Sequence, residues 1–154
     1  MGEFITLRKG HLRDKFESGN AELDNYLRQY ARQDQKRGAS QTWILPDPDN
    51  PYLIEAYYTL SAHSVVSDQL RFPYHAIPAI LLGRLAVHRN SQGKNYGRIA
   101  VVDALHRTKK ISSEIGLRFL IVKPINKGIE AFYLKLGFTH LIDSDYLYFD
   151  LNQF

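Results

Sequence analysis

The stretch from Ile80 to Arg98 contains the residue types that an anion-binding site requires. Its first part, up to Val87, is an apolar run that predicts a buried strand, and the segment from Tyr96 onward predicts a helix. In the loop that joins such a strand and helix, and in the first turn of the helix, unpaired backbone N–H groups and the helix dipole attract negative charge. An ordinary connection between a strand and a helix has the same pattern, so the loop alone does not decide its role.

Three residues between this strand and helix allow backbone to come close to a ligand. Gly93 and Gly97 carry no side chain, and Asn95 is one of the few other residues that tolerates a left-handed conformation. The P-loop pattern G-x-x-x-x-G-K-[ST] and the dinucleotide pattern G-x-G-x-x-G are both absent from the sequence. The sequence therefore predicts an anion site that follows neither of these patterns.

Length and composition limit the class of protein. The chain has 154 residues, 44% of them hydrophobic, which suits one domain over residues 1–154 with a full core. It has no cysteine, which excludes disulfides and thiolate catalysis, and its six histidines lack metal-ligand spacing. Neither a signal peptide nor a membrane span is predicted, so we expect a cytoplasmic location and no metal. The net charge of +4 permits an anionic partner without demanding one.

Hydrophobic periodicity predicts a mixed α/β domain around the loop. The expected order is strand, helix, three strands, helix, strand, helix and two closing strands. These elements are predicted near residues 4–7, 20–37, 41–45, 52–62, 80–87, 96–115, 117–122, 127–135, 138–141 and 146–151. Residues 64–78 contain two prolines and are expected to be irregular.

The helix predicted over residues 20–37 has an apolar face and a cationic face. The apolar face consists of Leu23, Tyr26, Leu27, Tyr30 and Ala31. On the opposite face Arg28, Arg32 and Lys36 recur every four residues. This stripe is either a solvated face, whose cations suit the end of a helix, or a surface that meets RNA phosphates.

Arg84 is unusual because it lies within the apolar run before the loop. A buried arginine without a partner is costly, so this side chain either pairs with a carboxylate or faces a cleft. In a cleft it would meet a phosphate of the substrate, and the sequence leaves both alternatives open.

Two further motifs complete the pattern. The run Gln92-Gly-Lys-Asn-Tyr-Gly97 lies on the turn from strand to helix, and the run A-F-Y-L-K-L-G-F spans Ala131 to Phe138. Together they resemble the GNAT family of acetyl-CoA-dependent N-acetyltransferases, whose pyrophosphate loop follows Q/R-x-x-G-x-G/A. Asn95 replaces the first glycine of that motif, which implies altered or weaker cofactor binding. The resemblance implies an α/β fold whose central mixed sheet has splayed parallel strands and is flanked by helices.

A third stretch narrows the resemblance. The segment F-E-S-G-N-A-E-L-D-N-Y-L, Phe16 to Leu27, resembles the opening F-x-C-G-N-x-x-L-[DN]-x-[FY]-L of GNAT toxins from toxin–antitoxin pairs, with Ser18 at the cysteine position. Tyr57–Ala62 and Leu82–Val87 match that subgroup too. The resemblance implies that the chain acetylates the α-amine of charged tRNA and so blocks translation. It also implies a ribbon-helix-helix antitoxin as partner and a homodimer.

The same resemblance implies the site residues. Those that would bind acetyl-CoA are Leu85, Ala86, Val87, Gln92, Gly93, Lys94, Asn95, Tyr96, Gly97, Arg98 and Asn126. Tyr133 lies at the family's position for a general acid, which would protonate the leaving thiolate. Without the motif, Tyr133 would be interpreted as a core aromatic residue.

The attacking amine also has to lose a proton. The predicted strand Ile80–Val87 lacks the carboxylate that many GNAT enzymes place there. An α-amine has a pKa of about 7.7 and a lysine side chain about 10.4, so only the α-amine has a substantial neutral fraction at cytoplasmic pH without a base. The missing carboxylate therefore favours an α-amine substrate, although Glu55 remains an alternative base. The competing functions are acetylation of a protein N-terminus or small amine, and acetyl-CoA binding without turnover.

Overall fold

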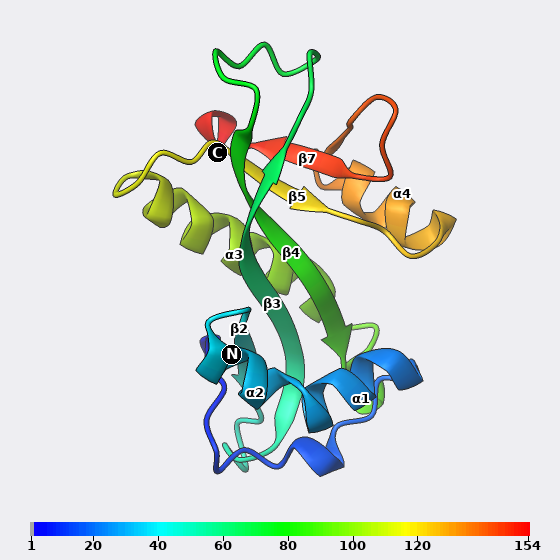
Figure 1. Ribbon diagram of the computed structural model, residues 1–154. Coiled ribbons are helices and arrows are strands. Elements are labelled where there is room, and N and C mark those ends of the chain that lie inside the picture. Colours follow the sequence, from blue (N-terminus) through cyan, green and yellow to red (C-terminus); the bar gives the residue numbers. More distant parts are fainter. Residues whose placement is uncertain (1) are drawn as a thin grey trace. The chain divides into compact units, whose positions relative to one another are not determined.

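The structure is a computed structural model that describes residues 2–154. It has the predicted mixed α/β class, with a seven-stranded sheet in the order β1-β2-β3-β4-β5-β7-β6. The strands are β1 (Ile5–Thr6), β2 (Gln41–Pro46), β3 (Ile54–Val65), β4 (Ile77–Val87), β5 (Phe119–Val122), β6 (Thr139–His140) and β7 (Leu147–Asp150). The α-helices are α1 (Ala21–Gln29), α2 (Ala31–Arg37), α3 (Tyr96–Ser112) and α4 (Lys127–Lys135) (Figure 1).

The chain divides into two compact units. The first runs up to Ser61 and also contains Arg84–Ala104, and the second consists of Ala62–Gly83 and Leu105–Phe154. Strands β3 and β4 and helix α3 each contribute residues to both units.

The first unit is built on the antiparallel pair of β2 and β3, in which Trp43 lies opposite Tyr58. Helices α1 and α2 run across strand β3 in Figure 1. Their buried residues share a core with Ile44 and Tyr57, so the predicted helical and strand periodicities meet in one apolar cluster. The helices begin and end at predicted positions: Asn20 Oδ1 accepts the amide of Leu23, and Gly38 ends α2 at φ +72°.

The prediction of a single helix over residues 20–37 is wrong in one respect, because the helix is interrupted at Tyr30. In an unbroken helix the carbonyl of Arg28 would accept the amide N–H of Arg32. Here it accepts a hydrogen bond from Arg13 Nη1 at 3.0 Å. Tyr30, at the interruption, is 48% exposed, whereas Tyr26 and Leu27 of the predicted apolar face are buried.

Opposite faces of the first unit's sheet carry different helices. Side chains of consecutive strand residues point to opposite faces. Tyr57 donates its hydroxyl hydrogen bond to the carbonyl of Leu23 in α1 at 2.6 Å, whereas Tyr58 donates to the carboxylate of Asp103 in α3. Helices α1 and α3 therefore lie on opposite faces of β3 in this unit.

The second unit holds the parallel pair of strands. Ala79–Leu82 of β4 pair with Phe119–Val122 of β5, and β7 pairs antiparallel with the other edge of β5. Strand β5 ends at Val122, whereas β4 continues to Val87. Helix α3 ends at Ser112, before the predicted end at residue 115, and Ile115 lies beyond the helix and is 63% exposed.

Candidate active site

The loop that leads into α3 has the backbone geometry predicted for an anion site. Gly93 and Asn95 have φ angles of +80° and +64°, so asparagine adopts the left-handed conformation that the family motif assigns to glycine. Within residues 2–154, the backbone N–H groups of Gly93 to Arg98 have no protein acceptor. We call these six N–H groups the amide nest. They lie at the N-terminus of a 17-residue helix, where the dipole adds to the attraction for anions.

The side chain of Gln92 supports the amide nest. Its Nε2 donates to the carbonyl oxygen of Ser18 at 2.7 Å and to that of Val87 at 3.0 Å. The amide group thus connects the loop to the end of β4 and to the N-terminal segment. Sequence analysis assigned Gln92 to cofactor binding, but nothing in the sequence indicated these two carbonyl partners.

Charged groups around the amide nest differ in their surroundings. Lys94 and Arg98 are exposed, which leaves both cations available to a ligand. Glu55 of β3 accepts a long hydrogen bond of 3.5 Å from the hydroxyl of buried Ser91. Burial, and then the charge of Asp47, raise the pKa of Glu55, although Lys94 acts against this shift. Glu55, the alternative base, therefore lies next to the loop that leads into α3.

The strand residues predicted to bind the cofactor are the last three of β4. Ala86 is 5% exposed and its side chain packs in the core of the first unit, so only its backbone is available to a ligand. Leu85 and Val87 alternate with Ala86 and are half-buried. The following residue, His88, donates its amide N–H to the carbonyl of Glu55 at 2.7 Å, which fixes the end of the strand against β3.

The candidate RNA-binding cations differ in their surroundings and lie on two helices. Arg28 is engaged structurally, because its Nη2 donates to the carbonyl oxygen of Phe16 at 2.7 Å. Arg32 is half-buried and Lys36 is exposed, both in α2. Since the helix is interrupted at Tyr30, the regular stripe expected from the spacing of four is not continuous.

The surroundings of Arg84 bear on the two alternatives that the sequence left open, an ion pair with a carboxylate or a position facing a cleft. Its guanidinium carbon lies 3.5 Å from the ring centroid of Tyr26, a cation–π contact. Within residues 2–154 it makes no ion pair with a carboxylate and donates no hydrogen bond. The structural ion pair considered for Arg84 is therefore not formed.

In the second unit, Tyr133 lies in α4 and is 6% exposed. Its ring contacts those of Phe132 and Phe138 edge to face, at centroid distances of 5.1 and 5.2 Å. Burial raises the pKa of Tyr133 well above the ordinary value for tyrosine. In the part of the chain that the structure describes, its hydroxyl has no hydrogen-bond partner, so the O–H group is available to a ligand.

Asn126 caps the N-terminus of the same helix. Its Oδ1 accepts the amide N–H of Ile129 at 2.9 Å. The side-chain oxygen therefore stabilises α4, and only the amide nitrogen remains for the cofactor contact predicted from the resemblance.

Comparison with known proteins places the chain in a family. No protein-family model matches the sequence. A relative from Mycobacterium tuberculosis named tRNA-acetylating toxin is 31% identical over 128 residues, which cover 80% of this chain and 75% of the relative. The chain belongs to the GNAT-type tRNA-acetylating toxins.

Solved structures agree with this toxin family. A KacT mutant is 23% identical to the chain with a TM-score of 0.90, covering 98% of this chain and 95% of KacT, and it supports the fold. AtaT complexed with acetyl-methionyl-tRNAfMet is 26% identical, with a TM-score of 0.89 and coverage of 98% and 94%.

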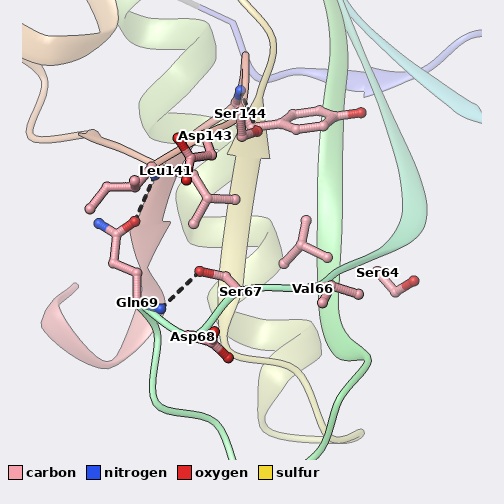
Figure 2. Close-up of a pocket in the computed structure, with 11 residues that line it drawn as sticks. Ser64, Val66, Ser67, Asp68, Gln69, Leu141, Asp143 and Ser144 are labelled. Atoms are coloured by element: carbon pink, nitrogen blue, oxygen red, sulfur yellow. Dashed lines mark hydrogen bonds between the residues drawn. The ribbon is translucent and has the colours of Figure 1, made fainter.

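This GNAT-type toxin also has a cavity that sequence analysis did not anticipate. It measures about 800 Å³ and lies in the second unit between residues 64–69 and 141–146 (Figure 2). The side chain of Gln69 joins the two segments: its Oε1 accepts the amide of Ile142 at 2.7 Å, and its Nε2 donates to the carbonyl of His140 at 3.0 Å. The lining contains Asp68 and Asp143 but no lysine or arginine, which disfavours an anionic ligand.

Among residues 2–154, no group of three or more histidine, cysteine or acidic side chains is arranged to hold a metal ion. In the same range no helix combines the length and the apolar character that a membrane crossing requires.

Proposed function

We propose that this chain transfers the acetyl group of acetyl-CoA to the α-amine of aminoacyl-tRNA and thereby blocks translation. The observation that carries the proposal is the relative named tRNA-acetylating toxin, 31% identical over 80% of this chain. The solved complex of AtaT with an acetylated aminoacyl-tRNA supports the same substrate class.

The amide nest would hold the pyrophosphate of acetyl-CoA. N–H groups without protein acceptors, at the positive end of α3, suit an anion with several acceptor oxygens. Lys94 and Arg98 would add positive charge beside them. Their exposure and the open backbone of Gly93, whose added Cβ would meet no atom within 4 Å, fit this group.

The end of β4 would align the rest of the cofactor. The backbone of Leu85 and Val87 lies beyond the last position at which β4 pairs with β5. A pantetheine arm contains amides, so it could pair with this backbone as an added strand would. An N–H near the thioester carbonyl would also stabilise the negative charge that develops on its oxygen.

Tyr133 would supply the proton for the leaving group. The neutral amine nitrogen forms a bond to the thioester carbonyl carbon, and the carbon–sulfur bond then breaks. The thiolate takes the hydroxyl proton of Tyr133, and the new amide nitrogen releases its extra proton to solvent, from which the tyrosine is reprotonated. Because burial raises the pKa of Tyr133, the hydroxyl stays protonated and ready to donate at neutral pH.

An α-amine fits the surroundings of this chemistry better than a lysine side chain. No acidic residue occurs in β4, and Glu55 contacts Ser91 of the loop. An α-amine with a pKa of about 7.7 needs little assistance to become neutral.

Membership of the toxin family and the motif at Phe16–Leu27 support three further proposals. We propose a ribbon-helix-helix antitoxin as the partner that restrains the toxin, a homodimer as its assembly and the cytoplasm as its location. The prediction that residues 1–154 form one domain belongs with these proposals.

The experiment that tests the function uses purified protein, radiolabelled acetyl-CoA and bulk charged tRNA. Uncharged tRNA and a peptide mixture serve as controls. We expect label on charged tRNA only, and its loss when the aminoacyl ester is hydrolysed. Identification of the released acetyl-amino acid then names the accepted amino acid.

Other outcomes separate the competing functions. Label on peptides or small amines would mean that one of these, and not charged tRNA, is the acceptor of the acetyl group. Acetyl-CoA binding without transfer to any amine would indicate a binding module.

A further inference from the structure

We propose that Arg84 and Tyr30, joined through Tyr26, form a platform for the single-stranded 3′ end of tRNA, with a phosphate on Arg84 and a base on Tyr30. We call these three residues the nucleotide platform. The proposal rests on the proposed function, because it assigns part of the surface that receives that substrate.

Arg84 brings hydrogen-bond donors that the protein does not use. Its guanidinium lies over the ring of Tyr26 and has no ion-pair partner within residues 2–154. Two carboxylates of the first unit are engaged by other donors. Asp24 accepts the Ser18 hydroxyl at 2.6 Å, and Asp34 accepts the hydroxyl of Tyr26 at 2.7 Å. A partly buried arginine in this state provides a planar fork of N–H groups that suits a phosphate.

Tyr26 holds the platform in position. It is 6% exposed, it packs in the core of the first unit, and its hydroxyl is fixed by Asp34. The ring therefore offers a rigid face on which the guanidinium of Arg84 rests, and the orientation of the cation is set before a ligand arrives.

Tyr30 extends the platform to the surface. Its ring is stacked against that of Tyr26, with centroids 6.4 Å apart and planes at 26°. It is 48% exposed and lies between the end of α1 and the start of α2. An exposed ring linked through a second ring to a cation without a partner is the combination that single-stranded nucleic acid uses, since bases stack on aromatic faces while phosphates meet cations.

Two nucleotides could supply this chemistry: the 3′ end of tRNA and the adenosine phosphate of acetyl-CoA. Arg84 shares its face of β4 with Ala86, which packs with Tyr26 and Leu27 of α1. The amide nest instead opens α3, and in the first unit α1 and α3 lie on opposite faces of β3. The position of Arg84 on the α1 face favours the RNA.

The test measures four variants. Tyr30→Ala removes the ring, Tyr30→Phe keeps it, Arg84→Gln removes the charge, and Arg84→Lys keeps the charge without the planar fork. Lys110→Gln and Tyr52→Ala are matched controls, because both residues are exposed and neither belongs to the proposed site. Each protein is assayed for the KM of charged tRNA, the KM of acetyl-CoA, and the binding of a labelled single-stranded RNA that ends in CCA, measured by fluorescence anisotropy.

We expect Tyr30→Ala to weaken RNA binding by roughly 5- to 150-fold, the range for a base stacked on an aromatic ring, while Tyr30→Phe stays near wild type. Arg84→Gln should weaken it too and make the logarithmic salt dependence shallower by about 0.7 for one phosphate contact. Arg84→Lys should keep this salt dependence but bind RNA more weakly than wild type. The KM of acetyl-CoA should not change in any variant, which also shows that the variants are folded.

The opposite results would overturn the platform. An unchanged RNA affinity in both Tyr30→Ala and Arg84→Gln would remove it, and a rise in the KM of acetyl-CoA alone would assign it to the cofactor. If the wild-type protein acetylated no charged tRNA, the proposed function would fail. The anisotropy measurement would still decide separately whether the platform binds RNA.

Discussion

Single residues carry most of the chemistry proposed for this toxin, and Tyr133 carries its proton transfer. The ring is buried between two phenylalanines, whereas the hydroxyl has no partner in residues 2–154. Packing and chemistry thus depend on different parts of one side chain, which allows them to be tested separately.

Replacing Tyr133 with phenylalanine should lower kcat by roughly 10²- to 10⁴-fold, the contribution of a general acid. The ring contacts remain and no protein hydrogen bond is lost, so the free energy of unfolding should change by less than about 0.5 kcal/mol. Steady-state kinetics and thermal unfolding measure the two effects, with Tyr74→Phe as a control on an exposed tyrosine. A full rate in Tyr133→Phe would exclude the residue from proton transfer.

Asn95 tests whether the amide nest depends on backbone conformation. At φ +64° asparagine is tolerated, glycine is unstrained, and a β-branched residue is disfavoured by about 1–2 kcal/mol. We therefore expect Asn95→Gly to leave the KM of acetyl-CoA unchanged or lower it, and Asn95→Val to raise it by about 5- to 30-fold. Asn90→Val, in the preceding turn, is the matched control. Equal KM values in all three variants would mean that this conformation does not matter for cofactor binding.

At the scale of elements, the interruption between α1 and α2 divides the cations predicted to form one stripe. The guanidinium of Arg28 donates a hydrogen bond to the carbonyl oxygen of Phe16. Arg32 and Lys36 on α2 therefore remain as the candidates for phosphate contact. Reversing both charges, as in Arg32→Glu with Lys36→Glu, should raise the KM of charged tRNA and make its salt dependence shallower. The KM of acetyl-CoA is the internal control. An unchanged salt dependence would make α2 an ordinary solvated helix.

Some features of the helices and strands were predicted from the sequence and others were not. Local signals predicted the order of helices and strands, the cap at Asn20 and the end at Gly38, because each depends on neighbours in the chain. At the interruption, the carbonyl of Arg28 accepts a hydrogen bond from Arg13, and the Gln69 contacts join residues more than 70 positions apart. The exposed Tyr30 and the cavity therefore could not be predicted from periodicity, whereas the left-handed Asn95 was, through its family motif.

At the scale of the whole molecule, the residues proposed for catalysis are spread along the sequence. The amide nest belongs to the first unit and Tyr133 to the second, while β4 contributes to both. The proposed reaction therefore depends on residues from the stretch of the chain between β4 and α4.

The pH dependence of the full reaction tests the proposed roles together. With no carboxylate in β4, the rate should rise as the α-amine loses its proton, near its pKa of about 7.7, and then level off. Because burial raises the pKa of Tyr133, its proton is lost only as the pH rises through that elevated value, so no decline is expected below about pH 10. Measurement of kcat/KM from pH 5.5 to 10 on charged tRNA checks both limbs.

The variant Glu55→Gln shows which group controls the rising limb. If the free α-amine controls it, the variant should keep the same midpoint and change only the KM of acetyl-CoA, since Glu55 lies beside the loop. We expect that KM to fall, because the substitution removes a negative charge near the pyrophosphate. Loss of the rising limb in Glu55→Gln, together with a lower kcat, would instead make Glu55 the base and reopen the choice between an α-amine and a lysine substrate.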